Sequence, residues 1–360
     1  MIRIKNFYRI FFLLILLFTF NFEGNSQSPI TDEINNKAKL FLNKSKDEKH
    51  INLSFKNKMP LKLFNNNLFI GYEFDLLPQG FIVISPFDNS IMAYSFENNF
   101  FNENKEASKI SLDILEKISY NSKLRKNKNT AYQRSPVSEI GPFVRSLFGQ
   151  VNCYDANDNL INVSNLFTPN NYAPGCVAVS LATLMHYYKW PVVGMGKHTD
   201  KDTYGSSRGN YTAEFDKTYY DWANIKEKYK YQHTTAEQRK ALGLLVYHAA
   251  IALDMDFEYN GSTSNVNRIP KAGANYFRYN AKYASASSPI FWKTVDTCMV
   301  HKIPVAFAIS GSGGIGHSIV CDGVRFENGS STFHHLNMGW WGSSNGWYNV
   351  KGSFNAGGYS

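Results

Sequence analysis

Residues 172–191, YAPGCVAVSLATLMHYYKWP, constrain the fold more than any other stretch of this 360-residue chain. The stretch opens with the turn sequence Ala173-Pro174-Gly175 and continues with apolar residues at helical spacing from Cys176 to Tyr188. The predicted helix is apolar over much of its circumference, so it belongs in the core of a domain. Its first residue is a cysteine, which is either a small buried hydrophobe or a nucleophile.

The position of Cys176 favours a nucleophile. A thiol in the first turn of a helix lies beside unsatisfied backbone N–H groups and the positive end of the helix dipole, which favour the thiolate. The same N–H groups can stabilise the oxyanion of an attacked carbonyl. The thiol also needs an imidazole, and His317 opens a predicted strand later in the chain, which matches the order Cys, His, Asn of papain-type peptidases. The chain has nine histidines, so the order by itself permits other pairs.

The first residues have the pattern of a secretion signal. Arg3, Lys5 and Arg9 precede an apolar run over residues 10–18, which has the length of a signal-peptide core and is short for a membrane span. We therefore expect a signal peptide over residues 1–26, no stable membrane anchor after its cleavage, and a secreted or periplasmic protein. An uncleaved membrane anchor is the alternative.

Cysteine content and charge exclude several classes of protein. The chain has four cysteines without Cys-x-x-Cys spacing, which predicts neither a disulfide framework nor a thiolate zinc site. The sequence does not determine whether Cys153, Cys298 and Cys321 form disulfides. The net charge of +9 is shared between the two halves, so we expect no nucleic-acid partner. The cysteines are Cys153, Cys176, Cys298 and Cys321.

Two further motifs do not predict a cofactor or a metal. Residues 311–316 match GxGxxG, but Gly316 leads into a predicted strand, whereas a dinucleotide site needs it to open a helix. His334 and His335 are adjacent on a predicted strand and face opposite sides, so they cannot chelate one ion together. We expect one of them in the interior, and neither a cofactor nor a metal.

The chain is predicted to be α+β, with two domains after the signal. Residues 28–125 form a small α+β unit, residues 121–140 a polar linker open to proteolysis, and residues 141–360 a larger domain with a buried helix first and strands near its end. The predicted helices cover residues 31–43, 106–120, 176–188 and 235–253, and the clearest strands cover residues 80–85, 90–95, 304–309, 317–321, 332–337 and 346–350.

Four blocks of the sequence resemble streptopain-like cysteine peptidases, a secreted bacterial family with a papain-like catalytic domain behind a propeptide. In the first half, residues 80–85 resemble the propeptide core of that family. The blocks are Gly175-Cys176-Val177-Ala178 with Met185-x-Tyr187-Tyr188-x-Trp190-Pro191; Asp254-Met255-Asp256 with Ser262-x-Ser264; Gly316-His317-Ser318-x-Val320-x-Asp322-Gly323; and Phe333-His334-x-Leu336-Asn337-x-Gly339-Trp340.

The resemblance implies a role for each matching residue. Cys176 is the nucleophile and His317 its general base. Gln150 matches the family's oxyanion-hole glutamine, and Asn337 matches the residue that orients the histidine. Supporting residues implied beside the site are Trp340, Gly316 and Gly339.

The chain departs from the family pattern in two places. Met338 stands where the family has a tryptophan beside the catalytic asparagine, and the sequence stops at Ser360, about where a last strand is expected. The hairpin register raises a separate conflict, because a two-residue turn at Asn328-Gly329 places His317 opposite Trp340 and turns Asn337 to the other face. We therefore predict a bulge or an odd-length loop in this hairpin that brings Asn337 to His317.

The expected function is that of a secreted cysteine endopeptidase made as a zymogen, which acts on proteins or peptides and is inhibited by its own propeptide. The family suggests a preference for hydrophobic residues two positions before the scissile bond. Two alternatives stay open: a transglutaminase, which passes the acyl group to an amine, and a catalytically inactive relative that acts as a binding module.

Overall fold

The computed structural model describes residues 29–45, 52–101, 105–125, 137–203, 205–310 and 316–351. The predicted signal peptide lies outside the described residues. The chain divides into two compact units, Met1–Lys44 and Ser45–Ser360. Helix α2 (Pro29–Ser45) lies almost wholly in the first unit and contains the helix predicted over residues 31–43.

The second unit is built on one antiparallel sheet, in the order β1-β3-β4-β5-β14-β13-β12-β11, with β2 paired to β3 and β6 paired to β12. Every strand predicted from the sequence is part of this sheet. Its strands are β1 (Ser54–Phe55), β2 (Leu61–Asn65), β3 (Leu68–Leu77), β4 (Phe81–Ile84), β5 (Ile91–Ser95), β6 (Val137–Ile140), β11 (Val305–Ser310), β12 (Gly316–Glu327), β13 (Ser330–Asn337) and β14 (Gly346–Tyr348).

The sheet runs without a break from the predicted propeptide into the predicted catalytic domain. Strand β14 lies between β13 and β5, and its residues Trp347 and Tyr348 are the partners of Tyr94 and Ala93. A Cβ added to Gly346 would lie 2.7 Å from the Tyr94 carbonyl oxygen, so only glycine permits this approach of the two strands.

Two apolar cores fill the second unit. One is shared by both halves of the chain, because it contains Phe81 and Phe100 from the first half and Met338 and Trp340 from the second. Helix α3 (Lys105–Arg125) packs on this core against β2, β3 and β5. The other core surrounds α4 (Cys176–Tyr188) and α5 (Ala236–Ala252) and comes from the second half alone.

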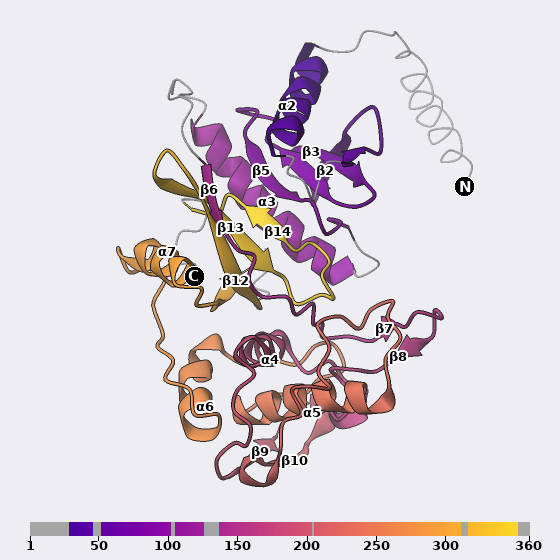
Figure 1. Cartoon of the computed structure of the whole chain (residues 1–360), viewed down its shortest axis with the longest axis vertical. Helices are drawn as coiled ribbons and strands as arrows, with labels where there is room; N and C mark the ends of the chain where they lie inside the picture. Colours follow the sequence, from indigo (N-terminus) through magenta and orange to yellow (C-terminus); the bar gives the residue numbers. More distant parts are fainter. Residues whose placement is uncertain are drawn as a thin grey trace, which may run out of the picture. The chain divides into compact units, whose positions relative to one another are not determined.

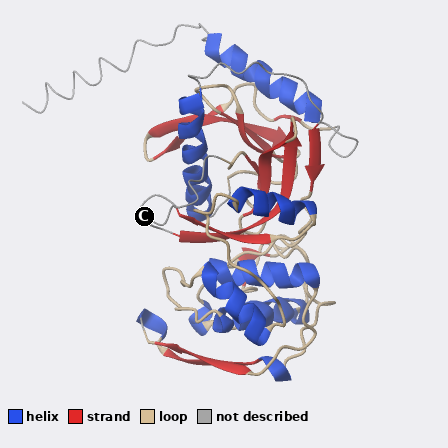
Figure 2. Ribbon diagram, turned by 90° about the vertical axis from the view of Figure 1, so that its left-hand side faces the viewer, coloured by secondary structure: helices blue, strands red, loops and turns tan. Residues whose placement is uncertain are grey.

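Helix α4 lies between the sheet and α5, where it contacts both β12 and α5 (Figure 1). The hairpin of β9 (Lys197–Asp202) and β10 (Gly209–Glu214) packs on the side of α5 away from the sheet (Figure 2). Thr235 and Gln238 form the predicted capping box at the start of α5. The remaining elements are α6 (Ile269–Tyr276), α7 (Phe291–Val300), β7 (Cys153–Tyr154), β8 (Leu160–Ile161), and the 3₁₀ helices η1 (Pro169–Asn171), η2 (Gly205–Ser207), η3 (Phe215–Lys217) and η4 (Val266–Arg268).

The α+β, papain-like fold class is confirmed. Of the linker predicted over residues 121–140, helix α3 includes its first residues up to Arg125 and β6 its last residues from Val137, and residues 126–136 lie outside the described residues. The basic run 123–128 therefore begins inside a helix. Among the described residues, no helix is long and apolar enough to cross a membrane.

The approach of β14 to β5 gives a test of the continuous sheet. In full-length protein, Gly346→Ala is expected to lower the free energy of unfolding by about 1–3 kcal/mol, since the methyl group would overlap the Tyr94 carbonyl. Gly316→Ala is the matched control, because nothing lies within 4 Å of a Cβ added there. Urea denaturation measures both. Equal stability of the two variants would contradict the close approach.

Candidate active site

The turn before α4 is built to place Cys176 at the start of the helix. Gly175 has φ +87°, and a Cβ there would lie 2.6 Å from the Met255 sulfur. The Ser262 hydroxyl donates to the Ala173 carbonyl at 2.5 Å, so residues 255 and 262 fix this turn. Gly175 makes no side-chain cap hydrogen bond at the start of α4. Cys176 begins α4 as predicted and is partly exposed.

The three other cysteines are poor candidates for a nucleophile. Burial raises the pKa of Cys153 to about 12, raises that of Cys321 well above its usual value and also raises that of Cys298. None of these three forms a disulfide. Thiolate chemistry is therefore left to Cys176.

The first turn of α4 lies against the strand that carries His317. The Ser318 hydroxyl donates to the Ser180 hydroxyl at 2.8 Å, and both side chains are buried. Gly339, which has φ +70°, also lies beside this turn, because a Cβ added there would contact Val179 at 3.7 Å. The fold therefore brings the N-terminal end of α4 to β12 and to the segment that follows β13.

His317 is buried and held in one tautomer. Its Nε2 is 2.9 Å from the Met338 carbonyl oxygen, and its ring stacks on Trp340 at 5.3 Å and 17°. Since a carbonyl only accepts, the proton is on Nε2 and the lone pair is on Nδ1. Burial lowers the pKa of His317 to about 4, against a smaller opposite effect of the bond to Met338. The imidazole is therefore neutral at neutral pH and able to act as a base.

The β12–β13 hairpin differs from the prediction. Its turn has two residues, Asn328 and Gly329, as expected, but it contains two bulges instead of one. Thr332 is the extra residue on β13 and Asp322 the extra residue on β12, so the two offsets cancel. Asn337 consequently pairs with Val320, and the predicted shift toward His317 does not occur.

The Asn337 side chain bonds to other groups than His317. Its Nδ2 donates to the Ser146 carbonyl at 2.7 Å, and its Oδ1 accepts from Gly339 N at 3.2 Å. The Ser146 hydroxyl in turn lies 2.6 Å from Nδ1 of His186, whose Nε2 donates to the Ile225 carbonyl. Burial lowers the pKa of His186 and keeps it neutral. This buried chain ties β13 to α4, while the acceptor for His317 is a backbone carbonyl at Met338.

Gln150 lies in a segment that is bonded to the tryptophans after β13. Trp341 N donates to the Phe148 carbonyl at 3.1 Å, the Trp341 indole donates to the Val151 carbonyl at 2.9 Å, and Gly149 bridges to Trp340. A Cβ on Gly149 would lie 2.5 Å from the Trp341 indole nitrogen, which explains the glycine before Gln150. Gln150 therefore directly follows a residue that bridges to Trp340, the ring on which His317 stacks.

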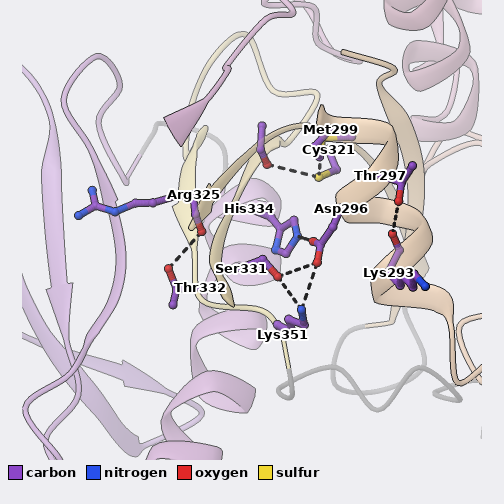
Figure 3. A network of polar contacts seen from close by, with 11 residues as sticks. Lys293, Asp296, Thr297, Met299, Cys321, Arg325, Ser331, Thr332, His334 and Lys351 are labelled. Atoms are coloured by element: carbon purple, nitrogen blue, oxygen red, sulfur yellow. Dashed lines mark hydrogen bonds and ion pairs between the residues drawn. The ribbon is translucent and has the colours of Figure 1, made fainter. Parts of the chain in front are cut away.

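The two adjacent histidines of β13 are both buried, whereas only one was expected inside. His334 Nε2 is 2.9 Å from Asp296 Oδ1 on α7, and Ser331 and Lys351 hold the other oxygen of that carboxylate (Figure 3). His335 Nδ1 is 2.5 Å from Asp322 Oδ1. Each histidine has its own carboxylate partner. No group of three or more His, Cys, Asp or Glu within the described ranges could hold a metal ion.

Sequence reasoning missed several groups of this site. The carbonyl of Met338 could not be predicted, because every residue has a backbone carbonyl and none differs in sequence from the others. Ser180 and Ser318 carried a usable signal, since one lies four residues after Cys176 and the other follows His317. Ser146 and His186 carried none, because only the fold brings them to Asn337.

Comparison with known proteins finds similar sequences and similar folds. Streptopain of Streptococcus pyogenes is 26% identical over 302 residues, which cover 78% of this chain and 73% of the relative. The structure of active interpain A, a cysteine protease of Prevotella intermedia, is 26% identical with a TM-score of 0.51 and covers 59% of this chain and 86% of its own.

A fragment of prointerpain A from Prevotella intermedia has the same fold, with a TM-score of 0.66 at 23% identity over 84% of this chain and 94% of its own. The sequence profile of the Peptidase C10 family matches residues 148–348, which include Cys176 and His317. This chain therefore belongs to the Peptidase C10 family and is a cysteine-type peptidase.

Proposed function

We propose that the protein is a secreted endopeptidase made as a zymogen, with Cys176 as nucleophile and His317 as its base. The observation that carries this proposal is the neutral His317 with its lone pair on Nδ1, on a strand bonded to the first turns of the helix that begins at Cys176. Secretion is supported by the signal pattern of residues 1–26.

The catalytic cycle follows from these positions. The proton of the Cys176 thiol passes to Nδ1 of His317, and the thiolate attacks the carbonyl carbon of a peptide bond. The oxyanion accepts hydrogen bonds from the Cys176 N–H and the Gln150 amide. The imidazolium then protonates the amine as the C–N bond breaks, and water attacks the thioester while His317 takes its proton. The C–S bond breaks last, which releases the carboxylic acid and returns the proton from His317 to the Cys176 sulfur. The Met338 carbonyl orients the ring, and the role of Asn337 stays a prediction.

The shared core supports a zymogen in which residues 28–125 restrain the active site. Phe81, Phe100 and Trp340 belong to one apolar core, and His317 stacks on Trp340. The same burial lowers the pKa of His317 to about 4, which disfavours the imidazolium that the first step must form. Removal of residues 28–125 would open this core and admit water near the ring, so that the thiolate–imidazolium pair forms more readily.

The nucleophile is tested with Cys176→Ala. The wild type is expected to shorten itself and to react with an epoxide thiol inhibitor, and the variant is expected to do neither, with its stability changed by less than about 1 kcal/mol because Cys176 is partly exposed. Cys298→Ala is the control thiol. Incubation with casein and a labelled amine separates hydrolysis from transglutamination: incorporation of the label without new fragments would contradict the endopeptidase, and inertness of the wild type would favour a binding module.

The activation cut is expected within residues 126–136. Cleavage on either side would require unfolding of the end of α3 or of β6, which pairs with β12 from Val137 to Ile140. N-terminal sequencing of the self-processed protein locates the cut. A first cut inside β6 or upstream of Arg125 would contradict this assignment.

The buried His317 predicts acid sensitivity of the zymogen. Its pKa is lowered from 6.5 to about 4, so between these pH values the unfolded chain binds more protons and stability falls as pH falls, by up to about 3 kcal/mol. Urea midpoints of Cys176→Ala protein, measured from pH 7 to pH 4.5, are expected to show this loss, and His317→Gln is expected to reduce the slope. The exposed His233→Gln is the control, and equal slopes in all three proteins would contradict a buried neutral His317.

A further inference from the structure

We infer that Ser180 and Ser318 are a positioning pair that sets the approach of His317 to Cys176. The inference rests on the proposed function, since it concerns the thiol and imidazole named there. The two hydroxyls are 2.8 Å apart and join the helix of the nucleophile to the strand of the base.

Each serine lies close to one of the two proposed reacting groups: Ser180 is one helical turn after Cys176, and Ser318 is the residue after His317. Ser180 follows Cys176 by four residues, so the two side chains lie on the same face of α4, one turn apart. Ser318 follows His317 directly on β12, so the two side chains leave the strand on opposite faces. The hydroxyl bond therefore fixes the strand backbone next to His317, while Met338 and Trp340 hold the imidazole itself.

Because both hydroxyls are buried, removal of only one of them is expected to lower the stability of the protein. Ser180 is 3% exposed and Ser318 is 1% exposed, so neither hydroxyl can exchange its partner for bulk water. Loss of one hydroxyl leaves the other unsatisfied, whereas loss of both removes the bond without an orphan group. The double variant therefore separates the effect on position from the effect on stability.

Position matters here because the proton transfer from Cys176 to His317 needs both side chains in one geometry. Helix α4 packs in one apolar core and β12 in the other, and apolar packing has no preferred direction, so by itself it permits small sliding of the helix on the sheet. A displacement of about 1 Å can lower a rate by about 100-fold. A buried hydroxyl pair fixes both the distance and the rotation of α4 relative to β12.

The experiment compares Ser180→Ala/Ser318→Ala with the wild type and with Ser85→Ala/Ser122→Ala. The control pair is also buried, with hydroxyls 2.5 Å apart, but lies in the predicted propeptide. Full-length proteins are activated by their own processing or by tagged wild type that is then removed. The measurements are kcat and KM on a peptide, the rate of iodoacetamide alkylation of Cys176 from pH 5 to pH 9.5 by mass spectrometry, and the urea midpoint.

The Ser180/Ser318 double variant is expected to keep its KM and urea midpoint and to lose about 10- to 100-fold in kcat. Its alkylation rate is expected to fall about tenfold or more at pH 6, where thiolate depends on His317, and to match the wild type at pH 9.5, where the thiol ionises unaided. Ser318→Thr, which keeps the hydroxyl on a residue suited to a strand, is expected to restore both values in the presence of Ser180. The control double variant is expected to behave as the wild type.

A double variant with wild-type kcat and an unchanged alkylation profile would overturn the positioning role. So would a loss of kcat that follows the urea midpoint, because a general loss of stability would then account for it. If the wild type neither hydrolyses the peptide nor shows faster alkylation at pH 6 than free cysteine, the proposed function itself is wrong and the inference is lost with it.

Discussion

The pairing of β5 with β14 is the constraint on which the rest of the second unit depends. It makes one sheet out of strands that lie about 250 residues apart in the chain, and it closes one apolar core over side chains from both halves. Ser344 extends the same joint, because its N–H and hydroxyl bond to the carbonyls of Asn99 and Phe100. Burial on this scale, at roughly 25 cal/mol per Å² of apolar surface, dominates any single polar contact at the joint.

The active site inherits its geometry from this sheet. Strand β12 carries His317, and the chain after β13 supplies both the acceptor for its Nε2 and the indole beneath its ring. The helix that carries Cys176 comes from the other core and meets β12 at a buried hydroxyl pair. The proposed nucleophile and base thus belong to elements of two different apolar cores, and directional contacts between these elements fix their relative position.

Much of the fold could be predicted from local sequence signals. The helix over residues 176–188 was located to the residue, because a Pro-Gly turn stops any earlier start and the apolar stripe sets its length. The strand Leu68–Leu77 was missed, since its Gly71 and alternating acids weaken a strand pattern, although Gly71 fits closely under Met92. This strand forms because it packs against residues distant in the sequence, and such packing leaves no local sequence pattern.

Candidate site residues could be named from the sequence, whereas most of their contacts could not. Cys176 and His317 followed from helix position and chain order, and Gln150 from a family motif. The acceptor for His317 could not be found in this way, because a backbone carbonyl has the same chemistry at every position. The two bulges of the hairpin were equally hidden, since an extra residue on a strand has no signature beyond a break in alternation.

The cancelling bulges at Asp322 and Thr332 limit how this hairpin can change its length. Deletion of Asp322 alone would turn the residues of β12 from Cys321 back to Gly316 to the opposite face relative to β13. Deletion of Thr332 alone would do the same to the residues of β13 from Phe333 to Asn337 relative to β12. The Met338 carbonyl and the Trp340 ring would then no longer meet the imidazole. An insertion or deletion on one strand of this hairpin therefore preserves the contacts of His317 only if a second one on the other strand compensates for it. Asp322 and Thr332 thus control the position of the imidazole without contacting it.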